Sequence, residues 1–141
     1  MLDQARSDLM NYVQAQLPAQ CASRSITAPA EYHTGLPVPT MIQQYPACVV
    51  DFDAGNVGGD QSTEMLHTVF VCIVDRDQDL ETLNVRLMKY VDAILASLDG
   101  KRFGTVIRCT ATKHDSSNLF TTGDSRAVRM RWVELSVRTV N

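Results

Sequence analysis

The chain has 141 residues, enough for one domain, and 45% of them are hydrophobic, enough for a single core. Because 13 Lys and Arg residues stand against 16 Asp and Glu residues, the net charge is −3, which excludes a general attraction to DNA or to anionic membranes. No apolar run approaches the ~18 residues that a membrane-spanning helix needs. We therefore expect one domain over residues 1–141, without a signal peptide, because the N-terminus is amphipathic and acidic early.

The charge is unevenly distributed along the chain. Residues 1–99 carry 5 basic and 13 acidic side chains, a net charge of −8, whereas residues 100–141 carry 8 basic and 3 acidic side chains, a net charge of +5. Such a chain can neutralise itself within one fold, or it can place oppositely charged faces against neighbouring copies. Charge alone favours the first alternative.

The N-terminal segment predicts a helix over residues 2–17, because its apolar residues recur at steps of three and four. Pro18 is expected to end this helix. Residues 18–44 contain most of the prolines and show no periodicity, so they predict an irregular arm or connector in which Pro37 and Pro39 favour extended backbone.

Two strands are predicted next, over residues 45–53 and 65–74. The first begins at Pro46, which is acceptable where a missing N–H costs least. The second has apolar residues on both alternating sets, whereas an antiparallel strand with one wet face should alternate with polar residues. This strand is therefore expected to be covered on both faces, by its own helices or by another subunit.

Residues 51–60, DFDAGNVGGD, lie between these two strands and contain three aspartates and three glycines. An EF-hand calcium loop would need oxygen ligands at positions 1, 3 and 5, glycine at 6 and glutamate at 12, and the last three requirements fail. Neither GxxxxGK[ST] nor GxGxxG is present. The stretch is interpreted as a hairpin loop, because Gly, Asn and Asp favour turns.

The clearest helix covers residues 79–98, with leucines and other apolar residues at steps of three and four. Asp77 or Asp79 can cap its start, and Gly100 follows its end. Asp75 and Asp77 belong to a charge cluster before this helix, interpreted as a solvated turn with an N-cap rather than as a metal site.

Two further strands are predicted over residues 105–112 and 126–139. In the last strand, Val128, Met130 and Trp132 share one parity, whereas Val133 and Leu135 share the other. Either a β-bulge near Trp132–Val133 brings both sets to one face, or each half packs on a different partner surface.

Residues 114–125, between these strands, are predicted to form a polar loop with Leu119 and Phe120 near its middle. Two adjacent apolar residues at a loop tip suggest docking to a partner, and folding back onto their own domain is the equal alternative. After the loop, Arg126, Arg129 and Arg131 form a basic group. Arg129 and Arg131 share a parity and are suited to ion pairs with acidic residues of a neighbouring copy.

No catalytic, metal-binding or cofactor-binding motif is found. GxSxG, HExxH and CxxC are absent, and the neighbours His114, Asp115 and Ser116 cannot adopt the geometry of a hydrolytic triad, whose members come from separate elements. A zinc site would have to combine distant cysteines with His33, His67 or His114, without ligand spacing. We interpret the four cysteines as small buried hydrophobic residues in a reducing compartment, namely Cys21, Cys48, Cys72 and Cys109.

In its order of elements the chain resembles the tail terminator, or tail completion, proteins of tailed bacteriophages. The resemblance rests on an N-terminal helix and arm, a strand opening with Tyr45-Pro46-Ala47, the strand HTVFVCIVD leading into the helix LETLNVRLMKYVDAILASL, and the closing strand RAVRMRWVELSVRTV. It implies an α+β fold, with a mainly antiparallel sheet of about four strands on which the N-terminal helix and the long central helix pack. It also implies a non-enzymatic structural protein.

Proteins of this family form a ring, typically a hexamer, that stops polymerisation of the tail tube and joins the tail to the head. The resemblance therefore implies a virion location after assembly in the host cytoplasm, contacts with the tail tube protein, the head–tail connector or neck protein and, in contractile tails, the sheath protein. Genomic DNA would pass through the ring without sequence-specific binding. The residues expected at the assembly contacts are Leu119, Phe120, Arg126, Arg129, Arg131, Asp75, Asp77, Pro37 and Pro39.

Three other interpretations stay open at this point. The chain could be a head-closure, neck or minor tail protein of the same machine, which the sequence hardly separates from a terminator. It could be a stand-alone α+β binding module that forms a small oligomer through a strand edge. A small enzyme is the third alternative, although the sequence contains no catalytic motif that supports it.

Overall fold

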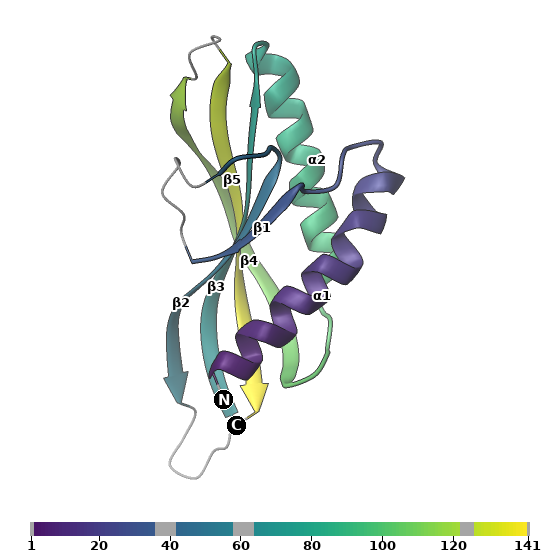
Figure 1. Ribbon diagram of the computed structural model, residues 1–141. Coiled ribbons are helices and arrows are strands. Elements are labelled where there is room, and N and C mark those ends of the chain that lie inside the picture. Colours follow the sequence, from purple (N-terminus) through teal and green to yellow (C-terminus); the bar gives the residue numbers. More distant parts are fainter. Residues whose placement is uncertain (1, 36–41, 58–63, 122–125, 141) are drawn as a thin grey trace.

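The computed structural model describes residues 2–35, 42–57, 64–121 and 126–140. Two helices and five strands follow in the order α1 (Leu2–Ser23), β1 (Glu31–Thr34), β2 (Ala47–Val57), β3 (Glu64–Asp77), α2 (Leu80–Leu98), β4 (Val106–Thr121) and β5 (Ala127–Val140). The strands form one sheet in the order β1-β2-β3-β5-β4, and both helices lie against one of its faces (Figure 1). Neither helix combines the length and the hydropathy needed to cross a membrane within the described residues.

The α+β class predicted from the sequence is confirmed, with one correction to the sheet. It has five strands rather than about four, because β1 pairs with β2, and this pair is parallel, whereas β2, β3, β5 and β4 pair antiparallel. The added strand lies inside the stretch predicted to be an irregular arm.

Helix α1 continues to Ser23, so the prediction that it ends at Pro18 is wrong. A proline inside a helix removes one backbone hydrogen bond. Burial compensates here, because the apolar stripe runs past the proline: Leu17 and Cys21, on either side of Pro18, are both 0% exposed. This stripe packs the helix against the sheet. Of the predicted arm, residues 18–44, only the part after Ser23 lies outside the helix.

Helix α2 begins and ends as predicted. The Asp79 carboxylate accepts a hydrogen bond from the Glu81 N–H at 3.1 Å and another from the Thr82 hydroxyl at 2.6 Å, which caps the first turn. At the other end Asp99 donates its N–H to the Leu95 carbonyl, and Gly100 has a φ of +75°. A glycine adopts this left-handed conformation without the strain that a Cβ would cause.

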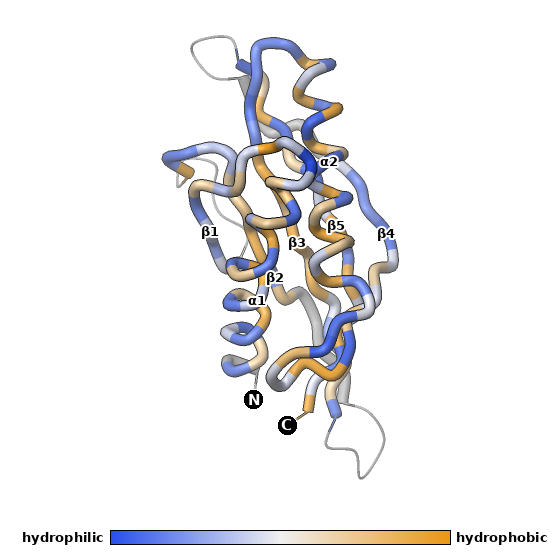
Figure 2. Tube along the Cα trace, turned by 90° about the vertical axis from the view of Figure 1, so that its right-hand side faces the viewer, coloured by the Kyte–Doolittle hydropathy of each residue, from blue (hydrophilic) through white to orange (hydrophobic). Residues whose placement is uncertain are grey.

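The main core lies between the helices and the sheet, as Figure 2 shows by looking onto the helices with the sheet behind them. From β3, Val69, Val71 and Ile73 point into this core and are 1% exposed or less. The opposite face of the sheet, which we call the open face, carries a second buried cluster that no residue of α1 or α2 joins. Strand β3 contributes residues to the main core on one face and to the second buried cluster on the other. This explains why its sequence is apolar on both alternating sets.

The change of phase in the last strand is explained by these two faces. Strand β5 pairs with β3 without a register shift, so the predicted β-bulge near Trp132–Val133 is wrong, and the shifts in the β4–β5 ladder fall where β4 carries an extra residue. Val133 joins the main core, whereas Val128, Met130 and Trp132 face the open side. The two halves of β5 thus pack on different surfaces, as the alternative prediction states.

Strands β2 and β3 form the predicted hairpin pair, but the strands are longer than expected. Strand β2 continues to Val57, so most of the predicted loop 51–60 is strand, with a register shift between Phe52 and Ala54. The rest of that stretch lies outside the described residues. The shift is a β-bulge, which lets the strand twist further.

Candidate assembly surfaces

The open face of the sheet is the largest feature that the two helices leave uncovered. Its buried cluster is covered by the segment before β2, which passes over the sheet and is tied down by Glu31. The carboxylate of Glu31 accepts the backbone N–H of Gln43 at 3.1 Å and that of Gln44 at 2.8 Å. The cluster consists of Ile42, Ala47, Val49, Cys72, Val74 and Val128.

This cover is incomplete at the centre and at one end of the open face. Phe70, Met130 and Trp132 pack against the cluster but stay partly exposed. Farther along the same face, Leu66 and Val140 are each 39% exposed. Exposed apolar side chains on a continuous sheet face are typical of a surface that another chain covers.

Asp75 and Asp77, two of the predicted contact residues, are engaged within their own chain. Arg86 on α2 donates from Nε to Asp75 at 2.7 Å, from one terminal nitrogen to Asp77 at 3.0 Å, and from the other to the Arg76 carbonyl at 3.0 Å. Asp75 is only 5% exposed, so the solvated turn predicted from the sequence is wrong at this residue. The network joins the end of β3 to α2 and leaves Asp75 unavailable to a partner.

Arg129 and Arg131 lie on the helix side of β5, next to β4. Arg129 donates to the Asn84 side chain on α2 and approaches Ser116 at 3.5 Å, while a nitrogen of Arg131 lies 3.4 Å from Nδ1 of His114. Neither guanidinium forms an ion pair with any residue that the structure describes. Both therefore retain a positive charge that no acidic side chain of the described chain neutralises.

The other predicted contact residues fall in different places. Leu119 and Phe120 belong to β4 by their backbone, since Phe120 is the register partner of Val128, so the predicted loop 114–125 is wrong up to Thr121. Arg126 precedes β5, is partly buried and has an interaction partner. Pro37 and Pro39 lie outside the described residues. In the register Asp75 lies opposite Arg129 and Phe120 opposite Val128, so the described residues of the predicted set lie at one end of the sheet.

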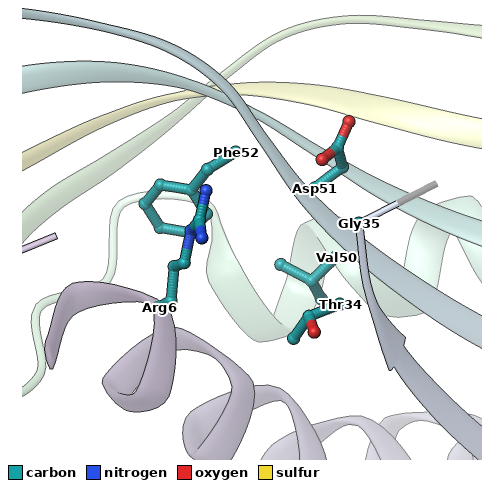
Figure 3. Close-up of a pocket in the computed structure, with 6 residues that line it drawn as sticks. All are labelled: Arg6, Thr34, Gly35, Val50, Asp51 and Phe52. Carbon is teal, nitrogen blue, oxygen red and sulfur yellow. The ribbon is translucent and has the colours of Figure 1, made fainter. Parts of the chain in front are cut away.

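A small cavity lies where α1, β1 and β2 meet (Figure 3). Arg6 extends over the ring of Phe52, 5.8 Å from its centroid, while Asp51 points away from Arg6. The volume is about 130 Å³, well below the roughly 300 Å³ at which pockets for small organic ligands begin. The arrangement therefore does not suit a substrate or a cofactor.

The ionisable groups of the interior form no chemical site in the described part of the chain. All four cysteines are free and buried, as predicted, and burial raises the pKa of Cys21 to about 11 and that of Cys72 to about 12, so both thiols stay protonated. No group of three or more His, Cys, Asp or Glu residues in the described ranges could hold a metal ion.

The sequence predicts that β3 is covered on both faces, by its own helices or by another subunit, but not which residues of the other strands share its second face. The register that puts Trp132 opposite Cys72, and Cys72 opposite Val49, is fixed only by pairing between distant segments. The available signal was the even parity of Val128, Met130 and Trp132 together with that of Cys72 and Val74.

No protein-family model matches the sequence, and no curated protein matches it either. Among solved structures, the chain is similar to a chain in the "virion of native gene transfer agent (GTA) particle". The two share 11% sequence identity and superpose with a TM-score of 0.60 over 98% of this chain and 96% of that chain. This similarity establishes a shared fold that extends over nearly the whole of both chains.

Proposed function

We propose that this chain is a structural protein of a tailed, phage-like particle and that it acts as the tail terminator. In this proposal copies of the chain form a hexameric ring at the head-proximal end of the tail, stop polymerisation of the tail tube and offer the surface that joins the tail to the head. The protein has no catalytic role and needs no cofactor.

The observation that carries the proposal is the fold shared with a virion protein over 98% of the chain. Because a fold alone does not determine a function, one feature of the surface adds support. The open face leaves apolar side chains for a neighbour. This suits a protein whose function is assembly.

The partners follow from this position. One side of the ring contacts the tail tube protein and the other contacts the head–tail connector or neck protein, with the sheath protein as a further partner in a contractile tail. Genomic DNA passes through the ring without sequence-specific binding, which agrees with a net charge of −3.

Tube assembly in vitro tests this role. Purified tail tube protein is allowed to polymerise with increasing amounts of this chain, and tube lengths are measured by electron microscopy. A terminator shortens the tubes in proportion to the amount added and binds only at their ends. Unchanged tube lengths, combined with binding to purified heads or connectors, would instead assign the chain to the head-closure or neck position.

A further inference from the structure

Among the residues that the structure describes, the sheet has two edge segments without a pairing partner, at diagonally opposite corners. Strand β1 covers the outer edge of β2 only at residues 47–50, and the Gly35 N–H extends this cover by one bond to the Val50 carbonyl, at 2.9 Å. From Asp51 to Val57, no described residue pairs with the outer edge of β2. An uncovered strand edge presents free N–H and C=O groups that can pair with another chain.

The other edge strand, β4, is covered in its first half and open in its second. The connection from α2 bonds to it: Gly100 donates to the Cys109 carbonyl at 2.8 Å, the Cys109 N–H donates to Lys101 at 3.2 Å, and the Asp99 carboxylate accepts the Ala111 N–H at 2.9 Å. Beyond Ala111 this cover stops. Between two register shifts, residues 113–118 then keep an uninterrupted register with β5, and no other described strand flanks them.

The two open segments carry opposite charge. Residues 113–118 and their register partners 129–134 on β5 hold three basic and two acidic residues, a net charge of +1, whereas residues 51–57 and their register partners 65–70 on β3 hold two acidic residues and no Lys or Arg, a net charge of −2. The basic residues are Lys113, Arg129 and Arg131, and the acidic residues of β2 are Asp51 and Asp53. Contact between unlike edges is therefore attractive, whereas contact between two like edges brings equal charges together.

We infer that the second half of β4 in one copy pairs with the second half of β2 in the next copy. The directions are compatible, because β2 and β4 run antiparallel within the sheet and meet antiparallel when a second sheet is added in the same orientation. Because Lys113 lies level with Asp51 across the sheet, the second sheet is also displaced along the strands by about six residues, roughly 20 Å, so that the two open segments meet. The contact is heterologous, so each copy uses one edge of each kind. Repeated around an axis, such a contact closes into a ring or continues as a filament.

This inference names the surfaces that meet within the ring of the proposed function, and it can fail separately from that function. In antiparallel pairing of residues 113–118 with residues 51–57, Lys113 meets the far end of the β2 segment, next to Asn56. Both positions have the parity of the open face, since Lys113 is the register partner of Glu134 and Asn56 that of Leu66. Variants Asn56→Cys and Lys113→Cys, singly and combined, are treated with a short bismaleimide at low salt, in the presence and absence of tail tubes. The native cysteines are buried, so the unmodified protein is the blank.

Heterologous pairing predicts that neither single variant cross-links alone, that an equal mixture of the two gives a dimer, and that the double variant gives a ladder of oligomers. Added salt should weaken all of these products. The combination of Lys113→Cys with Asp92→Cys, an exposed position on α2, is the matched control and should give none.

Two outcomes would overturn the inference: a dimer formed by a single variant alone, which indicates pairing of like edges, or no product from the mixture with or without tubes. A ladder without any binding to tubes would leave the edge pairing intact and contradict the terminator role. Capping of tubes without cross-links would support the terminator role and contradict the edge pairing.

Discussion

At the scale of single residues, α1 is joined to the start of β4 by Asp8. Its carboxylate accepts the Thr105 N–H at 2.8 Å and the Thr105 hydroxyl at 2.7 Å, and these hydrogen bonds, together with one from Gln4, hold the pKa of Asp8 below its usual value. The rings of Tyr12 and Phe103 stack beside it with centroids 3.9 Å apart. This approach requires a residue without a side chain at position 104.

Gly104→Ala should therefore destabilise the protein for two reasons. The residue has a φ of +51°, and an added Cβ would lie 2.6 Å from an oxygen of the Asp8 carboxylate. The left-handed conformation alone costs about 1–2 kcal/mol for a residue with a Cβ. Gly100→Ala is the control, since Gly100 has a φ of +75° but no atom within 4 Å of the added Cβ. Urea denaturation should show the larger loss for Gly104→Ala, and equal losses would contradict the clash.

His67 should make stability fall in mild acid. The side chain is 2% exposed, bonds to the Thr139 hydroxyl at 2.9 Å, and has its pKa lowered, first by burial and then by the charge of Arg6. Because the unfolded state binds the proton more tightly, the free energy of unfolding decreases as the pH drops below about 6.5 and is unaffected by His67 above it.

The measurement is urea denaturation of the wild type and of His67→Gln at pH values on both sides of about 6.5. The variant should lose stability at neutral pH but should depend less on pH than the wild type between neutral and mildly acidic solution. Equal pH dependence in the two proteins would show that His67 does not carry the effect.

At the scale of elements, Arg86 determines how α2 sits on β3. Its guanidinium holds Asp75 and Asp77 and also donates to a backbone carbonyl, so three groups at the end of β3 depend on one side chain. Arg86→Met should cost about 3 kcal/mol, the low end for breaking a buried pair, because it leaves the Asp75 carboxylate buried without a cation.

Thermal or urea denaturation checks this value against Lys89→Met, an exposed position one turn along α2. The control should change stability by less than about 0.5 kcal/mol. Asp75→Asn in the Arg86→Met background should recover part of the loss, because it removes the unpaired charge. A loss that persists unchanged in this double variant would assign the effect of Arg86 to packing.

The elements that could be predicted from the sequence are those whose signals are local. Helix α2 combines a periodic apolar stripe with an N-cap at Asp79 and a glycine at position 100, so its bounds follow from nearby residues alone. Strand β1 has only four residues and forms because β2 lies beside it, a contact that no local pattern records. The continuation of α1 past Pro18 likewise depends on tertiary burial of Cys21.

The candidate contact surfaces were less predictable than the fold, for the same reason. The basic character of β5 can be read directly from Arg129 and Arg131. Which edges are covered, however, depends on the short length of β1 and on two hydrogen bonds, one from the Gly100 N–H to the Cys109 carbonyl and one from the Cys109 N–H to the Lys101 carbonyl. Asp75 was assigned to a contact because nothing in the sequence reveals that Arg86, on the next helix, reaches it.

At the scale of the whole molecule, the two helices cover one face of the sheet, whereas its other face and two of its edge segments are only partly covered by the described residues. The helices complete one face, whereas the open face retains partly exposed Phe70 and Trp132, and two edge segments of opposite charge lie at opposite corners. A subunit of a ring meets a neighbour on each of two different sides. We therefore interpret these uncompleted surfaces as the places where neighbouring copies and tail components bind.

Electron microscopy of the purified protein mixed with tail tubes from a terminator-defective phage tests the central claim most directly. The account predicts rings with a central hole, free in solution or capping one end of the tubes, and it predicts that the unmixed tubes lack such caps. Monomers or small oligomers that ignore the tube ends would contradict it, and the open face of the sheet would then need a different partner.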